Sequence, residues 1–214
     1  SADQVAWPQK GRHAYDNGDH IRQHYHTWTT EESRLLNTWS LMWTGVGYVN
    51  AAIEDIQQVD PEAAGITQEE LESFVAESKV LRAYHYMKIM DLWGNVPIVT
   101  QVGMPENPET QSREAVFAFV EQELLENVEK LQPLSPQLLG RISRAVGYAM
   151  LSELYLNAEV WSGEARWADC ITYSDKVING DGGALAGSMM LDQDPLGPYN
   201  NTNENSPENI FQFP

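Results

Sequence analysis

The chain has 214 residues, and 42% of them are hydrophobic, which is enough to fill the core of one large or two small domains. Its 31 acidic residues outnumber the 13 basic ones and give a formal net charge of −18, so direct binding to nucleic-acid phosphates or anionic lipid headgroups is disfavoured. The single cysteine, Cys170, excludes an internal disulfide and a zinc site built on paired cysteines.

Residues 1–30 are polar, aromatic and rich in turn-forming residues, and they show no sustained hydrophobic period. We expect an irregular loop region that is accessible to ligand. The opening SADQVAWPQK lacks the apolar stretch of a signal peptide, and we expect both ends of the sequence to be cuts in a longer chain.

A first long helix is expected from residue 31 to about residue 57. Residues that recur at steps of three and four share one helical face there, namely Leu36, Trp39, Trp43, Val46, Asn50 and Ile53. We expect this face, with both tryptophans, to be buried in the core. The run over residues 35–53 carries no charge, but its polar residues favour a buried amphipathic helix over a membrane span.

Four further helices are expected along the chain. Thr67 and Glu70 have the spacing of a capping box, so the second helix starts there and runs to about Trp93, with Gly94 as its C-cap. The stretch VPIVT that follows has β-branched character and predicts a short extended piece. Three later helices are expected over residues 112–131, 142–158 and 165–178.

The last two of these helices have the pattern of a tetratricopeptide-type hairpin. The helix over 142–158 carries Gly147 and Ala149, which are small enough to permit close approach of a neighbour. The helix over 165–178 is amphipathic and bears Ile171. We expect the two helices to pack antiparallel.

These elements predict an all-α fold, with tetratricopeptide-like helical hairpins, long irregular loops and a few short strands. The chain 1–214 is expected to form a single helical domain with three parts. They are an irregular ligand-side loop at 1–30, the hairpin scaffold at 31–178 and a loop region at 179–214 that leads into a strand at NIFQFP.

Four segments, in this order, resemble the SusD/RagB family of outer-membrane glycan-binding lipoproteins. They are the opening from ADQVAWP to HYHTWT, then KVLRAYHYMKIMDLWGNVPIVTQ, then GRISRAVGYAMLSELYLNAEVW with Trp167 beyond it, and SPENIFQFP. Family members are longer, so the resemblance implies a piece that lacks an N-terminal stretch and the C-terminal half, which contributes part of the glycan pocket. The family's lipidated N-terminal cysteine has no counterpart here, because Cys170 lies within an expected helix.

The resemblance implies a binding protein without cofactor and without enzymatic activity. Such a protein captures oligosaccharide or polysaccharide at the cell surface and delivers it to a TonB-dependent, SusC-like transporter of the outer membrane, where a lipid anchor holds it. Two alternative hypotheses stay open, a tetratricopeptide-like adaptor for protein partners and a glycoside hydrolase fragment.

The predicted ligand-binding residues lie outside the expected helices and are Trp7, Arg12, Tyr15, Asp16 and Trp28. Exposed aromatic rings suit the C–H face of a sugar, and neighbouring polar groups can bind its hydroxyls. The alternative is that Trp7 and Trp28 pack the loop onto the first long helix.

The cluster DNGDHIRQHYHTW holds His20, His24 and His26, and imidazoles are common ligands of zinc and copper. We expect no metal there, because His20 and His24 share a face only on a helix, whereas His24 and His26 share one only on a strand. The cluster is interpreted instead as part of a sugar-facing loop.

Other carboxylates give no clear catalytic or metal site. Those on the expected helices have the pattern of solvated surface, and no acid pair is placed by the sequence in an apolar setting that would raise a pKa. Asp192, Asp194 and Gly197 match the start of an EF-hand loop, but Leu196 and Asn203 replace two of its ligands, so calcium binding in this loop stays open.

Overall fold

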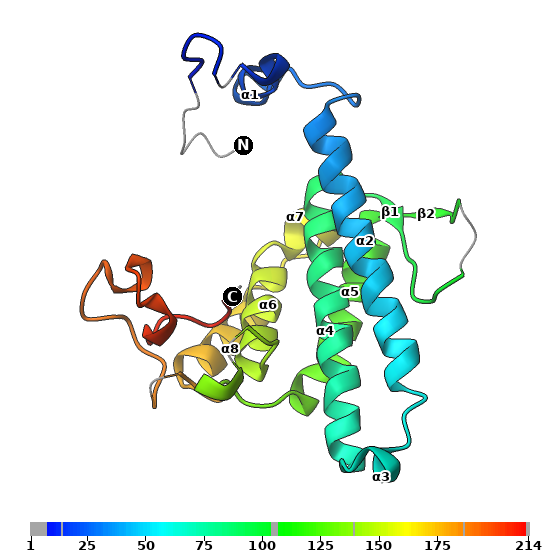
Figure 1. The fold of residues 1–214 in the computed structure, drawn as a ribbon, viewed down its shortest axis with the longest axis vertical. Helices are drawn as coiled ribbons and strands as arrows, with labels where there is room; N and C mark the ends of the chain where they lie inside the picture. The colour runs from blue at the N-terminus through cyan, green and yellow to red at the C-terminus, as the bar shows by residue number, and fades with distance from the viewer. Residues whose placement is uncertain (1–7, 14, 104–106, 139, 186, 213–214) are drawn as a thin grey trace. The chain divides into compact units, whose positions relative to one another are not determined.

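The computed structural model describes residues 8–13, 15–103, 107–138, 140–185 and 187–212 (Figure 1). The chain divides into two compact units, residues 1–44 and residues 45–214. The fold is all-α, as predicted. The helices of the described residues are α1 (Asp19–His24), α2 (Ser33–Ile56), α3 (Pro61–Ala64), α4 (Gln68–Trp93), α5 (Arg113–Asn127), α6 (Arg144–Leu156), α7 (Ala158–Ser162) and α8 (Trp167–Ile178).

The described strands are two-residue pieces. Strand β1 (Val96–Pro97) pairs antiparallel with β2 (Thr110–Gln111), so that Val96 lies opposite Gln111. This pair confirms the short extended piece expected after Gly94. In the described part of the chain, no helix is both long enough and apolar enough to cross a membrane.

The N-terminal unit contains more regular structure than the sequence indicated. A 3₁₀ turn over Asp16–Gly18 leads directly into α1, within the region expected to be irregular. Helix α1 has only six residues, too few for a hydrophobic period to be visible, so its side-chain contacts must hold it in place.

Helix α2 confirms the first long helix, but its apolar face is buried only in part. Val46, Val49, Asn50 and Ile53 are buried in the core of the second unit. Trp39 and Trp43, which were predicted to be core residues, are only partly buried, and their rings lie 5.3 Å apart. The helical period correctly identified one face of α2, but it could not show where along the helix that face stops being covered.

Helices α4 and α5 form the centre of the second unit. The capping box is present at the start of α4, since Glu70 N–H donates to Thr67 Oγ1 (3.1 Å) and Thr67 N–H donates to the Glu70 carboxylate (2.8 Å). Gly94 closes α4 at a φ of 75°, which favours glycine. Ser112 caps α5 by accepting a hydrogen bond from Ala115 N–H at 3.2 Å.

A buried polar network joins α2, α4 and α5. Arg82 donates to Glu123 (2.8 Å), to the Asn50 side-chain oxygen (2.9 Å) and to the Thr100 carbonyl (3.1 Å). Asn50 in turn donates to the Val99 carbonyl at 3.0 Å. Burial raises the pKa of the Glu123 carboxyl, and the guanidinium of Arg82 opposes that shift.

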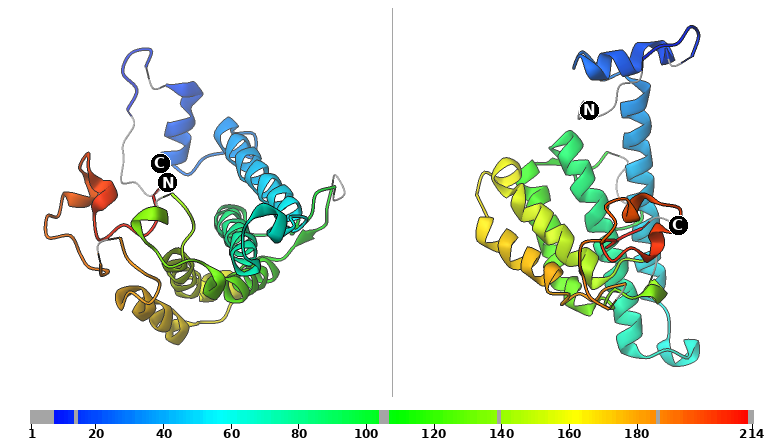
Figure 2. Two further views of the ribbon diagram at one scale, coloured as in Figure 1. Left: turned by 60° about the horizontal axis from the view of Figure 1, so that its bottom comes forward. Right: turned by 90° about the vertical axis from the view of Figure 1, so that its left-hand side faces the viewer.

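Helices α6 and α8 pack antiparallel side by side, as predicted (Figures 1 and 2). Lys176, near the end of α8, lies 4.5 Å from the ring of Tyr148 near the start of α6. Midway along the pair, Ser152 Oγ and Ser174 Oγ are 2.7 Å apart. Ile171 lies on the exposed side of α8.

Gly147 has a different packing role from the one expected. A Cβ at this position would lie 2.6 Å from Val128 Cγ2, in the 3₁₀ turn (Val128–Lys130) that follows α5. The close approach that Gly147 permits is therefore to this turn and not to α8. The sequence indicated the need for a small residue but could not identify the neighbour.

The region after α8 lacks the predicted terminal strand, because residues 209–212 have no strand conformation and the remaining two residues of NIFQFP lie outside the described part. The start of this region is anchored by a hydrogen bond from Leu134 N–H to the Gly182 carbonyl (2.7 Å). An alternating pattern forms a strand only where a partner strand supplies hydrogen bonds, and the described residues offer none here.

Candidate ligand-binding loop

The loop begins with a tight turn at Lys10–His13. Lys10 N–H donates to the His13 carbonyl and His13 N–H donates to the Lys10 carbonyl, both at 3.0 Å. Gly11 has a φ of 61° inside the turn. Arg12, a predicted site residue, is exposed at its tip. Trp7, the first predicted site residue, lies outside the described residues.

Three successive residues with positive φ shape the next part of the loop. Asp16, Asn17 and Gly18 have φ values of 41°, 55° and 78°. This conformation is unfavourable for residues other than glycine, although Asn and Asp tolerate it better than most. Contacts elsewhere in the unit must therefore hold the segment.

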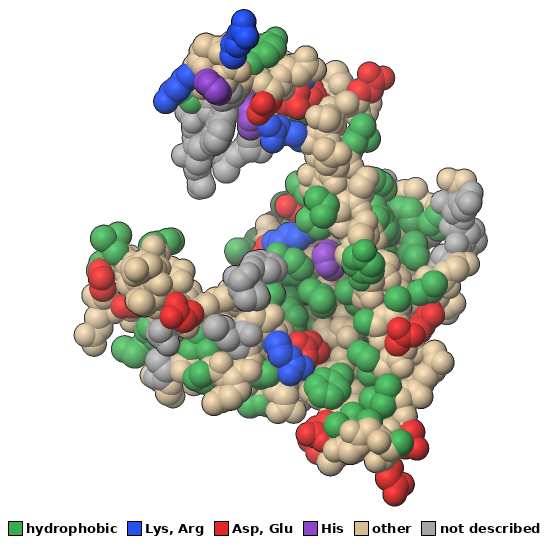
Figure 3. Space-filling view, in the orientation of Figure 1, with side chains coloured by type: hydrophobic (Ala, Val, Ile, Leu, Met, Phe, Trp, Pro, Cys, Tyr) green, Lys and Arg blue, Asp and Glu red, His purple; other side chains and the backbone are tan. Residues whose placement is uncertain are grey.

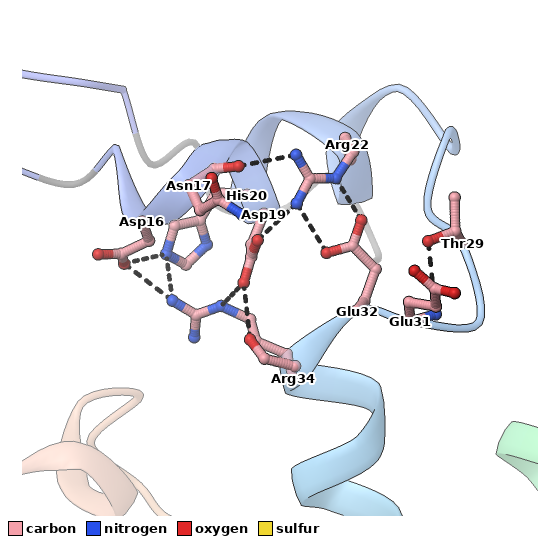
Figure 4. Close-up of polar contacts among 10 residues, drawn as sticks. Asp16, Asn17, Asp19, His20, Arg22, Thr29, Glu31, Glu32 and Arg34 are labelled. Carbon is pink, nitrogen blue, oxygen red and sulfur yellow. Dashed lines mark hydrogen bonds and ion pairs between the residues drawn. The ribbon is translucent and has the colours of Figure 1, made fainter.

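Arg22 on α1 supplies those contacts (Figure 4). Its guanidinium donates to the Asn17 carbonyl (2.7 Å), to Asp19 (2.6 Å) and to both carboxylate oxygens of Glu32, one of them at 2.8 Å. Asp19 and Glu32 are both buried. The hydrogen bonds from Arg22 lower the pKa of the Glu32 carboxyl, so this carboxyl stays ionised at neutral pH.

Arg34, in the first turn of α2, holds the other side of the loop. Its Nη2 lies 2.8 Å from Asp16 Oδ2 and 2.9 Å from His20 Nε2. Ser33 Oγ donates to Asp19 at 3.1 Å. His20 Nε2 also lies 3.1 Å from Asp16 Oδ2. Because a guanidinium only donates and a carboxylate only accepts, Nε2 accepts from Arg34 in one protonation form of the ring and donates to Asp16 in another. We call Arg22, Asp19, Glu32 and Arg34 the ion-pair clamp; it ties the loop and α1 to the start of α2.

Aromatic rings stand exposed on the loop that the clamp holds. Tyr15 and Trp28, both predicted, are exposed, and Trp28 makes an edge contact with His26 at 5.4 Å. Tyr25 is 69% exposed and makes an edge contact with His24 at 4.8 Å. Sequence reasoning missed Tyr25, although its place between two histidines outside the expected helices was the available signal.

The structure brings the predicted site residues together only in part. Asp16 follows Tyr15 in the chain and pairs with Arg34 and His20. Among the described residues, no hydrogen bond, ion pair or ring contact joins Arg12, Tyr15 and Trp28 to one another. They share one loop region of the chain.

Two groups of side chains are candidate metal sites, the histidines near α1 and the acidic residues of the loop at Asp192. His20 and His24 both lie on α1, and in the described part of the chain no three His, Cys, Asp or Glu side chains are grouped closely enough to hold an ion. Asp192 and Asp194 each accept a hydrogen bond from a backbone amide two residues on, and Asp192 also accepts from Ser206 Oγ at 2.9 Å. These carboxylates therefore shape their own loop.

A family model described as "Starch-binding associating with outer membrane", the SusD-like model, matches residues 3–156. The starch-binding protein SusD of Bacteroides thetaiotaomicron is 30% identical over 114 residues, which make up 53% of this chain and 20% of that protein. The solved structure of a SusD-like protein from Bacteroides fragilis matches this structure with a TM-score of 0.75 at 20% sequence identity. The match covers 94% of this chain and 37% of the Bacteroides fragilis protein.

The solved structure of a laminarin-binding SusD-like protein matches with a TM-score of 0.57 at 24% sequence identity. The match covers 65% of this chain and 29% of the laminarin-binding protein. These solved structures establish the fold that the helical hairpins adopt. The chain spans 20% of the curated relative and 29–37% of these two solved relatives.

Proposed function

The chain belongs to the SusD-like family, and from that premise we propose that the whole protein binds oligosaccharide or polysaccharide at the outer-membrane surface and passes it to a TonB-dependent, SusC-like transporter. The curated relative is named as starch-binding, and a solved relative is named as laminarin-binding. A lipid anchor would hold the protein at the membrane. Release to the transporter requires reversible binding, so no bond in the glycan need be broken.

The observation that carries this proposal is the set of exposed rings on a clamped loop. Tyr15, Tyr25 and Trp28 offer ring faces on which a sugar can stack. Arg12 and Asp16 offer a donor and acceptors for hydroxyls, and Trp7 is proposed to join them. Because the ion-pair clamp orders the loop before ligand arrives, less conformational entropy is lost on binding.

A glycosidase would need a carboxyl that can act as an acid near these rings. Glu123 is a carboxyl whose pKa burial raises, but it is enclosed between α4 and α5 and paired with Arg82. This placement favours a structural role for Glu123 and supports binding without hydrolysis.

The test is calorimetric titration of the whole protein with starch and laminarin oligosaccharides, together with a reducing-end assay of the same mixtures. Saturable binding without reducing-end release is expected. Reducing-end release would favour the hydrolase, and failure of every glycan to bind would reject the proposal. Co-purification with a SusC-like transporter tests the delivery step.

A protein adaptor is the second candidate, favoured by one observation on α8. Trp167, Ile171 and Ile178 are all exposed and recur at spacings of four and seven, which places them on one face of the helix. Such a stripe could bind a partner helix. The test replaces Ile171 and Ile178 by Ser. If the transporter no longer co-purifies but glycan binding is intact, the α8 stripe binds the transporter, and the protein both binds glycan and acts as an adaptor.

A further inference from the structure

Charge is divided unequally between the two units. Residues 1–44 contain four Lys or Arg against five Asp or Glu, a net charge of −1, whereas residues 45–214 contain nine against 26, a net charge of −17. Four of the five histidines also lie in the first unit. Figure 3 shows Lys, Arg and His side chains on the surface of this unit. The negative net charge of the protein therefore comes almost entirely from residues 45–214 and not from residues 1–44.

Within the first unit, the basic side chains fall into two groups. Arg22 and Arg34 are paired with Asp19 and Glu32 in the ion-pair clamp, and Arg34 is also paired with Asp16. Lys10, Arg12 and His13 are exposed, and no acidic partner for them is found among the described residues. We call these three residues and Gly11 the basic turn; Lys10 and Arg12 give it positive charge, on a strongly acidic protein, that no described acidic residue pairs with.

The basic turn lies close to a predicted sugar-stacking ring. Three peptide units separate Arg12 from Tyr15, so their Cα atoms can be no more than about 11 Å apart. The long side chain of Arg12 can cover much of that distance. A sugar stacked on Tyr15 thus lies within reach of the cations of the turn, whatever the conformation of the two residues between Arg12 and Tyr15.

We propose that the basic turn binds the carboxylate or sulfate groups of an anionic polysaccharide, so that the preferred ligand is an acidic glycan, such as one containing uronic acids. This inference rests on the proposed glycan-binding function. The guanidinium of Arg12 can donate two parallel hydrogen bonds to a carboxylate or sulfate, whereas the ammonium of Lys10 acts as a point charge. Neutral hydroxyls require neither group.

The first experiment compares matched oligosaccharides by calorimetry on the whole protein. A neutral glucan and a uronate oligomer of equal length are titrated at salt concentrations of about 50 mM and 500 mM, which differ in how far they screen surface charges. We expect the uronate oligomer to bind at least about tenfold more tightly at low salt, and this preference to fall strongly at high salt.

The variants Arg12→Gln and Lys10→Gln locate the effect. Each variant should lower the ratio of uronate affinity to glucan affinity towards one. Arg12→Gln should have the larger effect, because it removes the guanidinium that donates two parallel hydrogen bonds to a carboxylate. Lys130→Gln is the control, since Lys130 is an exposed cation of the second unit, and it should leave the ratio unchanged. Circular dichroism checks that each variant keeps its helical content.

The outcomes separate the two proposals. Glucan binding equal to or tighter than uronate binding rejects the acidic-glycan inference and leaves the glycan-binding function standing. An unchanged ratio in both turn variants also rejects it. Failure to bind either oligomer rejects both proposals. If vesicles containing anionic lipid bind the wild type but not Arg12→Gln, and the uronate is not bound, the turn serves a membrane surface and the inference is wrong.

Discussion

The guanidinium of Arg82 on α4 contacts the carboxylate of Glu123 on α5 at 2.8 Å, and both side chains are buried. Removing one member leaves the other charged and unpaired inside the protein. We therefore expect Arg82→Met to lower the free energy of unfolding by about 3–5 kcal/mol. Urea denaturation of the whole protein measures the change.

The control is Lys88→Met on the same helix. Lys88 pairs with Glu153 at 3.1 Å, but the two side chains are 35% and 49% exposed to water, so we expect a loss below about 1 kcal/mol. The double variant Arg82→Met with Glu123→Leu should recover much of the stability lost in the single variant. Equal losses in Arg82→Met and Lys88→Met would contradict a buried role for the Arg82 pair.

Much of the scaffold could be predicted from the sequence because its signals are local. The capping box of Thr67 and Glu70 and the cap at Ser112 act within one helical turn, and Gly94 follows directly after α4, so neighbours in sequence suffice to recognise them. Helix α1 could not be found in this way. Its stability depends on contacts of Arg22 with Glu32, ten residues away, and such pairing is a property of the fold.

The candidate site was predictable in composition but not in geometry. The aromatic residues Tyr15 and Trp28 were identified from their position outside any helical period, and both are exposed. The clamp that holds their loop was not identified, because Arg22 and Glu32 individually resemble ordinary surface charges. The role of the five predicted residues in binding stays a prediction.

Gly147→Ala should destabilise the protein through overpacking. The added Cβ would lie 2.6 Å from Val128 Cγ2, and a β-branched valine has little freedom to move away. We expect a loss of about 1–3 kcal/mol in the free energy of unfolding. Gly47→Ala on α2 is the matched control, since its Cβ would meet no atom within 4 Å, and it should stabilise by about 0.5–1 kcal/mol. If both variants are stabilising, the close contact with Val128 is wrong.

His85 should make stability depend on pH. Its imidazole packs against Gly45, its Nδ1 is buried without a hydrogen-bond partner in the described residues, and burial lowers its pKa below 6.5. His85 therefore binds a proton more readily in the unfolded chain than in the folded protein. The free energy of unfolding keeps its full value above pH 6.5 and falls as the pH drops through that value.

The measurement for His85 is urea denaturation at pH 7.5 and at pH 5.5, values chosen on either side of the ordinary histidine pKa of about 6.5. The wild type should lose more stability between the two than His85→Leu, which has no titrating group at this position. The other four histidines are common to both proteins, so the difference isolates His85. Parallel pH profiles of the two proteins would rule out this linkage.

Arg22→Lys should loosen the loop without unfolding the scaffold. Lysine keeps the positive charge but cannot contact the Asn17 carbonyl, Asp19 and both oxygens of Glu32 together. We expect faster amide hydrogen exchange over residues 16–24 and weaker glycan binding. Arg141→Lys is the control, because Arg141 makes a similar two-pronged contact with Glu77 in the second unit, and it should leave both readouts unchanged. Faster exchange with unchanged affinity would show that loop order does not matter for binding.

Trp28→Ala should weaken glycan binding while leaving the melting temperature nearly unchanged. The ring is 46% exposed and contacts His26 at its edge, so its removal opens no large cavity. Loss of one stacking ring is expected to cost about 1 kcal/mol, roughly fivefold in Kd. Trp167→Ala is a closely matched control, since Trp167 is 48% exposed but lies on α8, and its loss should leave glycan affinity unchanged. Paired calorimetric titration and thermal melting of the two variants distinguish the hypotheses. If Trp28→Ala melts at a clearly lower temperature and binds glycan normally once folded, Trp28 packs the loop and takes no part in the sugar site.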